Sequence, residues 1–305
     1  MRVFQFRGGR ISTKNINQVE AMAAGTFTIK SKDGTRLEGR SWIPEGNMDT
    51  VVCLVHGLGE HVGRYGGVGS ILNSKHIGML GIDLRGHGES DGKRGHTPSY
   101  DHLLDDVQAL LDHIKSTYPD QAIILYGHSL GGNIATNFLL RRDTSGLVGG
   151  VISSPWYKLA FEPPAFKVAL AKMMRNIYPA FTEPNDIDPA DLSTDPEVGR
   201  AYTADPLVHS KITAGMFFSV FEAGNWALDH ANELQIKTLV MHGSEDKLTS
   251  AEGSVEFVKN AGGIATFQSW EGMRHEPHNE PGDSVATFVA GWIQGINQPN
   301  ETVTA

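Results

Sequence analysis

Short apolar runs alternate along the chain with longer segments of helical periodicity. The runs are Val51–Val55, Met79–Asp83, Ala122–Tyr126, Gly149–Ser153, Thr238–His242 and Ala265–Trp270. Runs that are apolar on both faces are typical of buried parallel strands. Before them, Thr26–Lys30 and Glu38–Trp42 flank Asp33-Gly34, which predicts a hairpin.

Helices are predicted between these runs. Ser99–Tyr118 repeats apolar residues at helical spacing and stops before Pro119. Leu130–Arg142 and Asp283–Gln294 have the same character. Strands that alternate with helices predict an α/β fold with a mostly parallel, doubly wound central sheet.

The alternation breaks between Ser154 and about His230. This stretch shows no clear strand pattern, is rich in aromatic residues and methionine, and is interrupted by prolines. One interpretation is a helical excursion with a small core of its own; the other, which we favour, is an inserted helical cap, or lid, that lines an apolar substrate pocket. We therefore predict a core of residues 23–154 and 231–298, a cap of residues 155–230, and a poorly ordered segment at residues 1–22.

Composition narrows the range of functions. The 305 residues carry a formal charge of −9, and no basic stretch offsets it, which argues against nucleic acid as a partner. The single cysteine, Cys53, excludes an internal disulfide and is expected to be a buried thiol. The sequence shows neither a secretory signal nor an apolar stretch of membrane-spanning length. We expect a cytoplasmic protein.

One pentapeptide carries a specific chemical signal. Gly127-His128-Ser129-Leu130-Gly131 follows a predicted strand and precedes a predicted helix. A serine on such a sharp turn is exposed to a substrate carbonyl, and the turn is too tight for a Cβ on either side. Ser129 is the predicted nucleophile.

A serine nucleophile needs a base, and the base needs an orienting carboxylate. Two later strand ends supply both: Asp246 follows Thr238–His242, and His275 follows Ala265–Trp270. The neighbouring Glu245 and His278 remain alternatives at this stage. Along the chain the three residues come in the order Ser129, Asp246, His275.

The oxyanion of the tetrahedral intermediate needs two donors. Leu130, directly after the nucleophile, offers one backbone N–H, and Leu58, in the glycine-rich loop after Val51–Val55, offers the other. His56 is expected to brace that loop. The predicted pocket lining comprises His56, Glu60, His61 and Trp156.

Three other patterns suggest different chemistry and are set aside. Gly57-Leu58-Gly59 with Gly63 imitates a dinucleotide fingerprint, but the third glycine is one position late and Glu60 would repel a pyrophosphate. His275-Glu276-Pro277-His278 lacks the zinc-motif spacing, and its proline would break the required helix. Arg85-Gly86-His87-Gly88 is interpreted as a structural turn. Neither a nucleotide nor a metal is predicted.

With these residues in place, the chain resembles the monoacylglycerol lipase and lysophospholipase-like branch of the α/β-hydrolases. The matching segments are HGLGEHVGRY (56–65), DLRGHGESDGKRG (83–95), GHSLGG (127–132), HGSEDKL (242–248) and GMRHEPHNE (272–280). The resemblance implies an α/β-hydrolase fold with a lid over an acyl-chain tunnel, no cofactor, and peripheral contact with lipid surfaces. It places Ser129, Asp246 and His275 as the triad and Leu58 and Leu130 as the oxyanion donors. Residues 155–230 cannot be matched position by position.

The leading hypothesis is a serine hydrolase that cleaves monoacylglycerol to glycerol and fatty acid through an acyl-enzyme. A lysophospholipase or a general short- to medium-chain carboxylesterase is the alternative, and a catalytically inactive hydrolase fold used for binding is a distant one. The acyl length, the head group, the lid mobility and the oligomeric state are not determined by the sequence.

Overall fold

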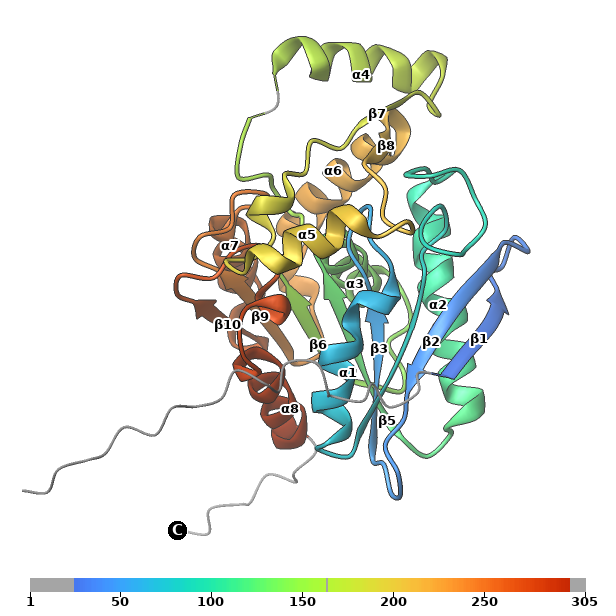
Figure 1. Cartoon of the computed structure of the whole chain (residues 1–305), viewed down its shortest axis with the longest axis vertical. Coiled ribbons are helices and arrows are strands. Elements are labelled where there is room, and N and C mark those ends of the chain that lie inside the picture. The colour runs from blue at the N-terminus through green and yellow to red at the C-terminus, as the bar shows by residue number, and fades with distance from the viewer. Residues whose placement is uncertain (1–24, 163, 297–305) are drawn as a thin grey trace, which may run out of the picture.

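A mixed sheet of eight strands forms the centre of the molecule (Figure 1). The computed structural model describes residues 25–162 and 164–296. The strand order is β1-β2-β4-β3-β5-β6-β9-β10, and all neighbours from β4 to β10 pair in parallel. The strands are β1 (Gly25–Lys30), β2 (Arg36–Trp42), β3 (Thr50–Val55), β4 (Ile77–Ile82), β5 (Ala122–His128), β6 (Leu147–Ser153), β9 (Thr238–Gly243) and β10 (Ala265–Trp270).

Helices cover both faces of this sheet. The helices of the core are α1 (Gly66–Asn73), α2 (Tyr100–Thr117), α3 (Leu130–Arg141), α7 (Ala251–Ala261) and α8 (Ser284–Ile296). Residues of α2, α3 and α7 share one apolar cluster with one face of the sheet, and residues of α1 and α8 share a second cluster with the other face. This arrangement confirms the predicted doubly wound, mostly parallel α/β fold.

The sequence pattern located each strand of this sheet within three residues at either end. It missed α1 and α7, which are short, and the η helices of the core, η1 (Val62–Tyr65), η3 (Ala231–Glu233), η4 (Gly262–Ile264) and η5 (Pro277–Asn279). The prediction for residues 1–22 lies outside the described residues.

The segment predicted as a cap lies beyond the carboxyl ends of the parallel strands, at the top of Figure 1. Its elements are α4 (Ala165–Ile177), β7 (Thr182–Pro184), η2 (Pro189–Asp191), α5 (Pro196–Ala204), β8 (Lys211–Thr213) and α6 (Ala214–Asp229). Here the sequence interpretation was incomplete, because β7 and β8 form a two-stranded antiparallel sheet where no strand was expected. Each has only three residues, which is too short for a periodic pattern to appear.

Helix α6 of this segment is hydrogen-bonded to α3 of the core. The Asn133 side chain on α3 donates to the carbonyl of Val220 (3.1 Å), and Asn137 donates to that of Ala223 (3.2 Å). Gly224 lies so close to Tyr157 that a Cβ would be 2.4 Å from the Tyr157 carbonyl oxygen. Helix α4, by contrast, stands away from the sheet at the far end of the molecule (Figure 1). No described helix is both long and apolar enough to cross a membrane.

Buried polar contacts hold the loops that follow β3 and β4. Asp83 accepts hydrogen bonds from the N–H groups of Val62 and Glu89, both at 2.8 Å. Arg85 is 3% exposed and binds both carboxylate oxygens of the fully buried Asp106 (2.6 and 2.7 Å). Removing one partner of such a pair leaves a buried charge uncompensated. The Arg85–Gly88 loop, predicted as a structural turn, is thus held to α2 by the Arg85–Asp106 ion pair. Asp83, just before it, is hydrogen-bonded to Val62 in the segment that follows β3.

Candidate active site

Ser129 lies on a strained turn between β5 and α3. Its backbone has φ +54° and ψ −115°, a region that non-glycine residues seldom occupy. The neighbouring glycines are required by space: a Cβ on Gly127 would be 2.2 Å from the Gly131 carbonyl oxygen, and one on Gly131 would be 2.0 Å from that of Val55. The turn therefore projects the Ser129 side chain from the carboxyl edge of the sheet.

The structure brings the three predicted side chains together in one line. Ser129 Oγ lies 2.9 Å from His275 Nε2, and His275 Nδ1 lies 2.7 Å from Asp246 Oδ2. His275 is 4% exposed, and the side chain of Asp246 is fully buried. These distances suit transfer of the serine proton to a histidine whose orientation is set by a carboxylate. Of the two alternatives, Glu245 is exposed, and His278 stacks on Tyr65.

The Asp246 carboxylate is surrounded by donors. Besides His275, it accepts hydrogen bonds from the backbone N–H groups of Leu248 (2.8 Å) and Thr249 (3.1 Å) and from the Thr249 hydroxyl (2.9 Å). Burial raises the pKa of Asp246, but the charges of His275 and His242 and the hydrogen bonds that they form lower it by more, so the net pKa lies below the ordinary value. Asp246 is therefore kept in its ionised form.

The pKa of His275 moves the other way. Burial lowers it most, but the charge and hydrogen bond of Asp246 together with the charges of Glu276 and Glu60 raise it by more, and the net pKa is above the ordinary value. A raised pKa makes His275 a better acceptor for the serine proton, as a general base requires.

The two predicted oxyanion donors both lie next to the serine, Leu130 in the chain and Leu58 in the lining of the same pockets. Leu130 is the first residue of α3, where backbone N–H groups have no intrahelical acceptor. Leu58 follows Gly57, whose N–H donates to Glu60 Oε1 (2.6 Å) and whose added Cβ would lie 3.3 Å from Ser129 Cβ. The next residue, Gly59, has φ +79° and accepts the N–H of His209 at 2.8 Å, so the loop also contacts the cap.

A small polar pocket of about 240 Å³ opens on one side of Ser129. Its lining includes the carboxylates of Glu60 and Glu276, both 2% exposed, and Tyr202 of α5. Arg64 joins the two carboxylates, because it binds Glu60 Oε2 at 2.6 Å and both oxygens of Glu276 at 2.7 and 2.8 Å. The hydroxyl of Tyr202 is buried, and it forms no hydrogen bond with any described residue.

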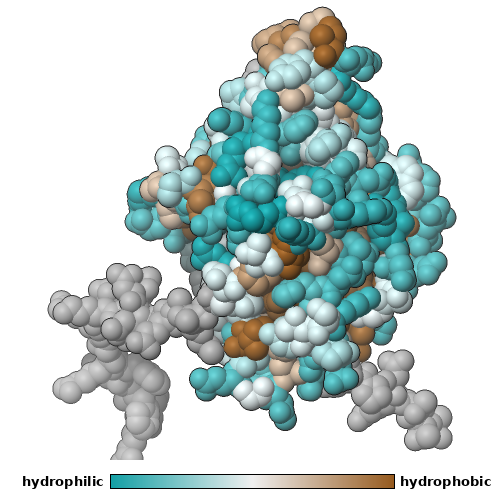
Figure 2. All heavy atoms as spheres, turned by 90° about the vertical axis from the view of Figure 1, so that its right-hand side faces the viewer, coloured by the Kyte–Doolittle hydropathy of each residue, from teal (hydrophilic) through white to brown (hydrophobic). Residues whose placement is uncertain are grey.

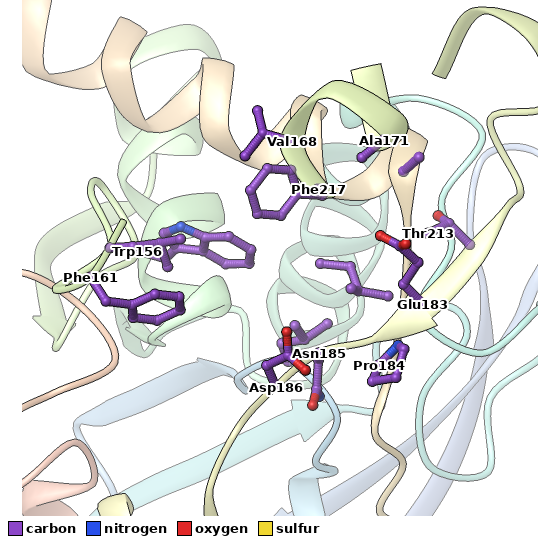
Figure 3. A pocket seen from close by; sticks show the side chains of 14 residues that line it. Trp156, Phe161, Val168, Ala171, Glu183, Pro184, Asn185, Asp186, Thr213 and Phe217 are labelled. Atoms are coloured by element: carbon purple, nitrogen blue, oxygen red, sulfur yellow. The ribbon is translucent and has the colours of Figure 1, made fainter. Parts of the chain in front are cut away.

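A mostly apolar cavity also borders Ser129. A volume of about 410 Å³ beside Ser129 and His275 shares Leu58, Trp156 and Phe161 with a further cavity of about 780 Å³ beneath α4 and α6. Figure 3 shows Trp156 and Phe217 turned into this second cavity, with Glu183 and Asp186 on its far side. The cavity extends from the serine toward the cap and is mostly lined by hydrocarbon.

The four predicted pocket-lining residues divide into two pairs. Glu60 lines the polar pocket, and Trp156 lines the apolar cavity. His56 and His61 line neither of these two cavities, and His56 has the loop-bracing position that the sequence suggested. His56 is fully buried and fixes its loop by accepting from Leu84 N (2.9 Å), and His61 binds Asp205 of the cap (2.9 Å).

Sequence reasoning missed other residues at this site. Arg64 and Glu276 lie within the motifs HGLGEHVGRY and GMRHEPHNE, where a buried ion pair could have been suspected from the neighbouring charges. Tyr202 lies in the segment predicted as a cap, where the sequence showed no motif that pointed to it. Among residues 25–162 and 164–296, no cluster of three or more histidine, cysteine or acidic side chains could hold a metal ion.

Comparison with known proteins agrees with this geometry. Residues 46–282 match the family model described as serine aminopeptidase, S33. The chain is 32% identical to a monoacylglycerol lipase of Mycolicibacterium smegmatis, over 85% of this chain and 93% of that protein. It is also 32% identical to an uncharacterized abhydrolase domain-containing protein of Dictyostelium discoideum, over 90% of this chain but only 29% of that longer protein.

A solved structure shares the fold closely. The crystal structure of a monoacylglycerol lipase from Paleococcus ferrophilus superposes with a TM-score of 0.78 at 32% identity, and the match covers 85% of this chain and 99% of that one. The chain therefore belongs to the serine aminopeptidase S33 family and has the α/β-hydrolase fold.

Proposed function

We propose that this protein is a serine esterase that hydrolyses monoacylglycerol-like lipid esters to glycerol and a free fatty acid. One observation carries the proposal: a pocket lined in part by Glu60 and Glu276 and a mostly apolar cavity both border Ser129, and the apolar cavity adjoins a further one beneath the cap helices. A monoacylglycerol has the same division, with a neutral polyol on one side of the ester and a hydrocarbon chain on the other. The relatives named as monoacylglycerol lipases support the same substrate class.

The proposed reaction follows from the line of side chains. Ser129 Oγ attacks the ester carbonyl while its proton passes to His275 Nε2. The N–H groups of Leu58 and Leu130 bind the oxyanion. His275 then protonates the leaving glycerol oxygen as the tetrahedral intermediate collapses to the acyl-enzyme. Water, deprotonated by His275, attacks the acyl group, and the fatty acid leaves as Ser129 regains its proton.

The charges of the polar pocket favour glycerol over a phosphate-bearing head group. Glu60 and Glu276 are both buried, and the single guanidinium of Arg64 is engaged by both of them. Carboxylates accept hydrogen bonds from the hydroxyls of glycerol but repel a phosphate. We therefore rank the lysophospholipase alternative below monoacylglycerol hydrolysis, although a phospholipase of Bacillus subtilis is among the relatives at 26% identity.

A substrate panel tests this function. We expect kcat/KM to be higher for monoacylglycerols than for lysophospholipids or methyl esters of equal chain length, and to rise with chain length up to a limit. Each methylene that enters the apolar cavity is worth about 0.8 kcal/mol. A flat or falling chain-length profile would favour a short-chain carboxylesterase, and a preference for the lysophospholipid would overturn the assignment of the head group.

We also propose that α4 brings the enzyme to lipid surfaces. Its outer face carries a stripe of exposed apolar residues spaced by three or four positions: Phe166 (72% exposed), Leu170 (37%), Met173 (51%) and Ile177 (71%). Figure 2 shows hydrophobic side chains at the top of the molecule, the end at which Figure 1 places α4. The inner face, with Ala171 and Val168, packs on α6 and lines the cavity, so the stripe lies next to the route of the acyl chain.

Replacing both Phe166 and Ile177 by serine tests the contact. We expect vesicle binding and hydrolysis of vesicle-borne monoacylglycerol to fall, while hydrolysis of a dissolved short-chain ester stays unchanged. The control is the double serine variant of Val255 and Phe288, which are also exposed but lie on α7 and α8. Equal loss in both double variants would contradict a specific role for α4.

The cytoplasmic location remains a prediction from the sequence.

A further inference from the structure

A second histidine binds the carboxylate that orients His275. His242 Nε2 lies 2.9 Å from Asp246 Oδ2, the same oxygen that His275 Nδ1 approaches at 2.7 Å. The His242 side chain is fully buried, as is that of Asp246. Within the described residues, Asp246 Oδ2 thus lies between two imidazole rings, and nothing in the sequence pattern suggested the second.

The strand geometry explains why His242 points to this place. Side chains alternate between the two faces of a strand, so His242 shares a face of β9 with Val240. Val240 belongs to the apolar cluster that α7 covers through Phe257. On that helix Ser254, also fully buried, lies with its Oγ 2.8 Å from His242 Nδ1. The ring is therefore held at both nitrogens.

The contacts of the two nitrogens assign the protons. Nε2 faces only oxygen atoms: Asp246 Oδ2, the Thr249 carbonyl at 3.2 Å and the Thr249 hydroxyl at 3.3 Å. A carboxylate and a carbonyl are acceptors, so Nε2 carries a hydrogen. Among the described residues, Nδ1 has one hydrogen-bond partner, the Ser254 hydroxyl, which can donate to it. The hydrogen bonds thus run from Ser254 to His242 and from His242 to Asp246.

We propose that His242 is a positioning residue for the catalytic reaction. It does not touch the substrate; it fixes the Asp246 oxygen that in turn orients His275. The proposal rests on the serine esterase chemistry proposed above but not on the identity of the head group. The hydrogen bond from His242 also draws charge from the carboxylate, which limits how strongly Asp246 attracts the proton of His275.

The expected effect on pH dependence has a definite sign. The charged and titratable groups that act on His275 are Asp246, Glu276, Glu60, His128 and His278, and those that act on His242 are Asp246 and Glu252. Without the His242 donor, Asp246 holds the His275 proton more tightly, and the pKa of His275 rises. Because the reaction needs neutral His275, the acidic limb of kcat/KM moves to higher pH.

Two substitutions separate positioning from packing. The amide of glutamine reaches the place of His242 Nε2, so His242→Gln keeps a donor to Asp246. The shorter amide of asparagine reaches only the place of Nδ1, so His242→Asn keeps the contact with Ser254 and loses the donor. His113→Asn, on the partly exposed face of α2, is the matched control.

The assay uses a dissolved short-chain ester, followed by titration of the released acid. We expect His242→Asn to lower kcat by about 10- to 100-fold with little change in KM, and to shift the acidic limb upward. We expect His242→Gln to recover most of kcat and the normal pH profile, and His113→Asn to behave as the wild type. Equal rates and profiles for the asparagine and glutamine variants, at equal thermal stability, would overturn the proposal.

A measurement on the wild type keeps the test independent of variant folding. A long-range ¹H–¹⁵N correlation spectrum of the histidine-labelled protein should show His242 with a protonated Nε2, and a slowly exchanging N–H at that position. An Nδ1–H tautomer would overturn the proposal. The wild-type rate on the short ester reports separately on the esterase function, and the rate on monoacylglycerol reports on its substrate.

Discussion

The loops around Ser129 and the cap above them are built on different principles. In the loops, buried polar groups are bound on several sides: Asp246 has donors from Leu248, Thr249 and two histidines, and Glu60 is bound by Arg64 and by the N–H of Gly57. In the cap, α4 exposes much of its apolar surface and packs mainly on α6. The difference indicates that changes in the loops act on kcat, whereas changes in the cap act on substrate choice.

The largest expected effect is in the loops. Asp246→Asn should lower kcat by about 10⁴-fold with little change in KM, because the amide cannot hold His275 in the required tautomer. Steady-state kinetics on a dissolved ester measures it. The control is Glu245→Gln, which removes the neighbouring but exposed carboxylate and should leave kcat unchanged. A larger loss in the Glu245 variant would transfer the role of the acid to that residue.

A single methyl group should also disturb the loop that carries Leu58. A Cβ on Gly57 would lie 2.8 Å from Glu60 Oε1 and 3.3 Å from Ser129 Cβ, so Gly57→Ala must displace either the buried Glu60 carboxylate or the loop. We expect kcat to fall by about 10²-fold, the typical cost of losing one oxyanion donor. Gly67→Ala, where an added Cβ meets no heavy atom within 4 Å, is the matched control. Equal activity of the two variants would argue against Leu58 as a donor.

The pH profile examines the electrostatics of the same loops. Burial lowers the pKa of His275, but Asp246, with smaller contributions from Glu276 and Glu60, raises it by more, so its net pKa lies above the ordinary value of about 6.5. The base must be neutral, and activity should therefore fall as the pH drops through this raised pKa. Measured kcat/KM for an uncharged ester should have its acidic midpoint above 6.5, and Asp246→Asn should lower it. An unshifted midpoint in that variant would contradict the assigned source of the shift.

The smallest effect is expected in the cap. Phe217 faces the apolar cavity beneath α4 (Figure 3), so Phe217→Ala should enlarge the space for the acyl chain. We expect the optimum of kcat/KM to move to longer chains, with each added methylene worth up to about fourfold, and the rate on a short dissolved ester to stay nearly constant. Phe288→Ala on α8 is the control, and an unchanged optimum in both would remove Phe217 from the determinants of chain length.

The sequence predicted the loops better than the cap for a physical reason. Parallel strands buried on both faces need continuous apolar runs, and the residues that follow those runs must meet at one edge of the sheet. The strand pattern was therefore enough to place Ser129, Asp246 and His275 together. The residues bound to them, such as His242 and Arg64, were not found because only the folded chain shows which buried polar groups face one another.

The cap has no comparable constraint. The helices of the cap pack on the surface of the core, and α4 stays largely exposed. Neither the hydrophobic periodicity of these segments nor their length therefore determines how they are arranged. The strands β7 and β8 and the position of Tyr202 depend on contacts between distant segments, such as the hydrogen bond from His209 N to the Gly59 carbonyl. Those contacts leave no local pattern in the sequence.

The most direct test of the account is covalent labelling of the nucleophile. The protein is treated with a fluorophosphonate, digested, and the modified peptide is identified by mass spectrometry. We expect one stoichiometric adduct on Ser129, complete loss of ester hydrolysis with labelling, and neither adduct nor activity in Ser129→Ala. Ester hydrolysis retained by Ser129→Ala, or an adduct on another residue with activity abolished, would contradict the account.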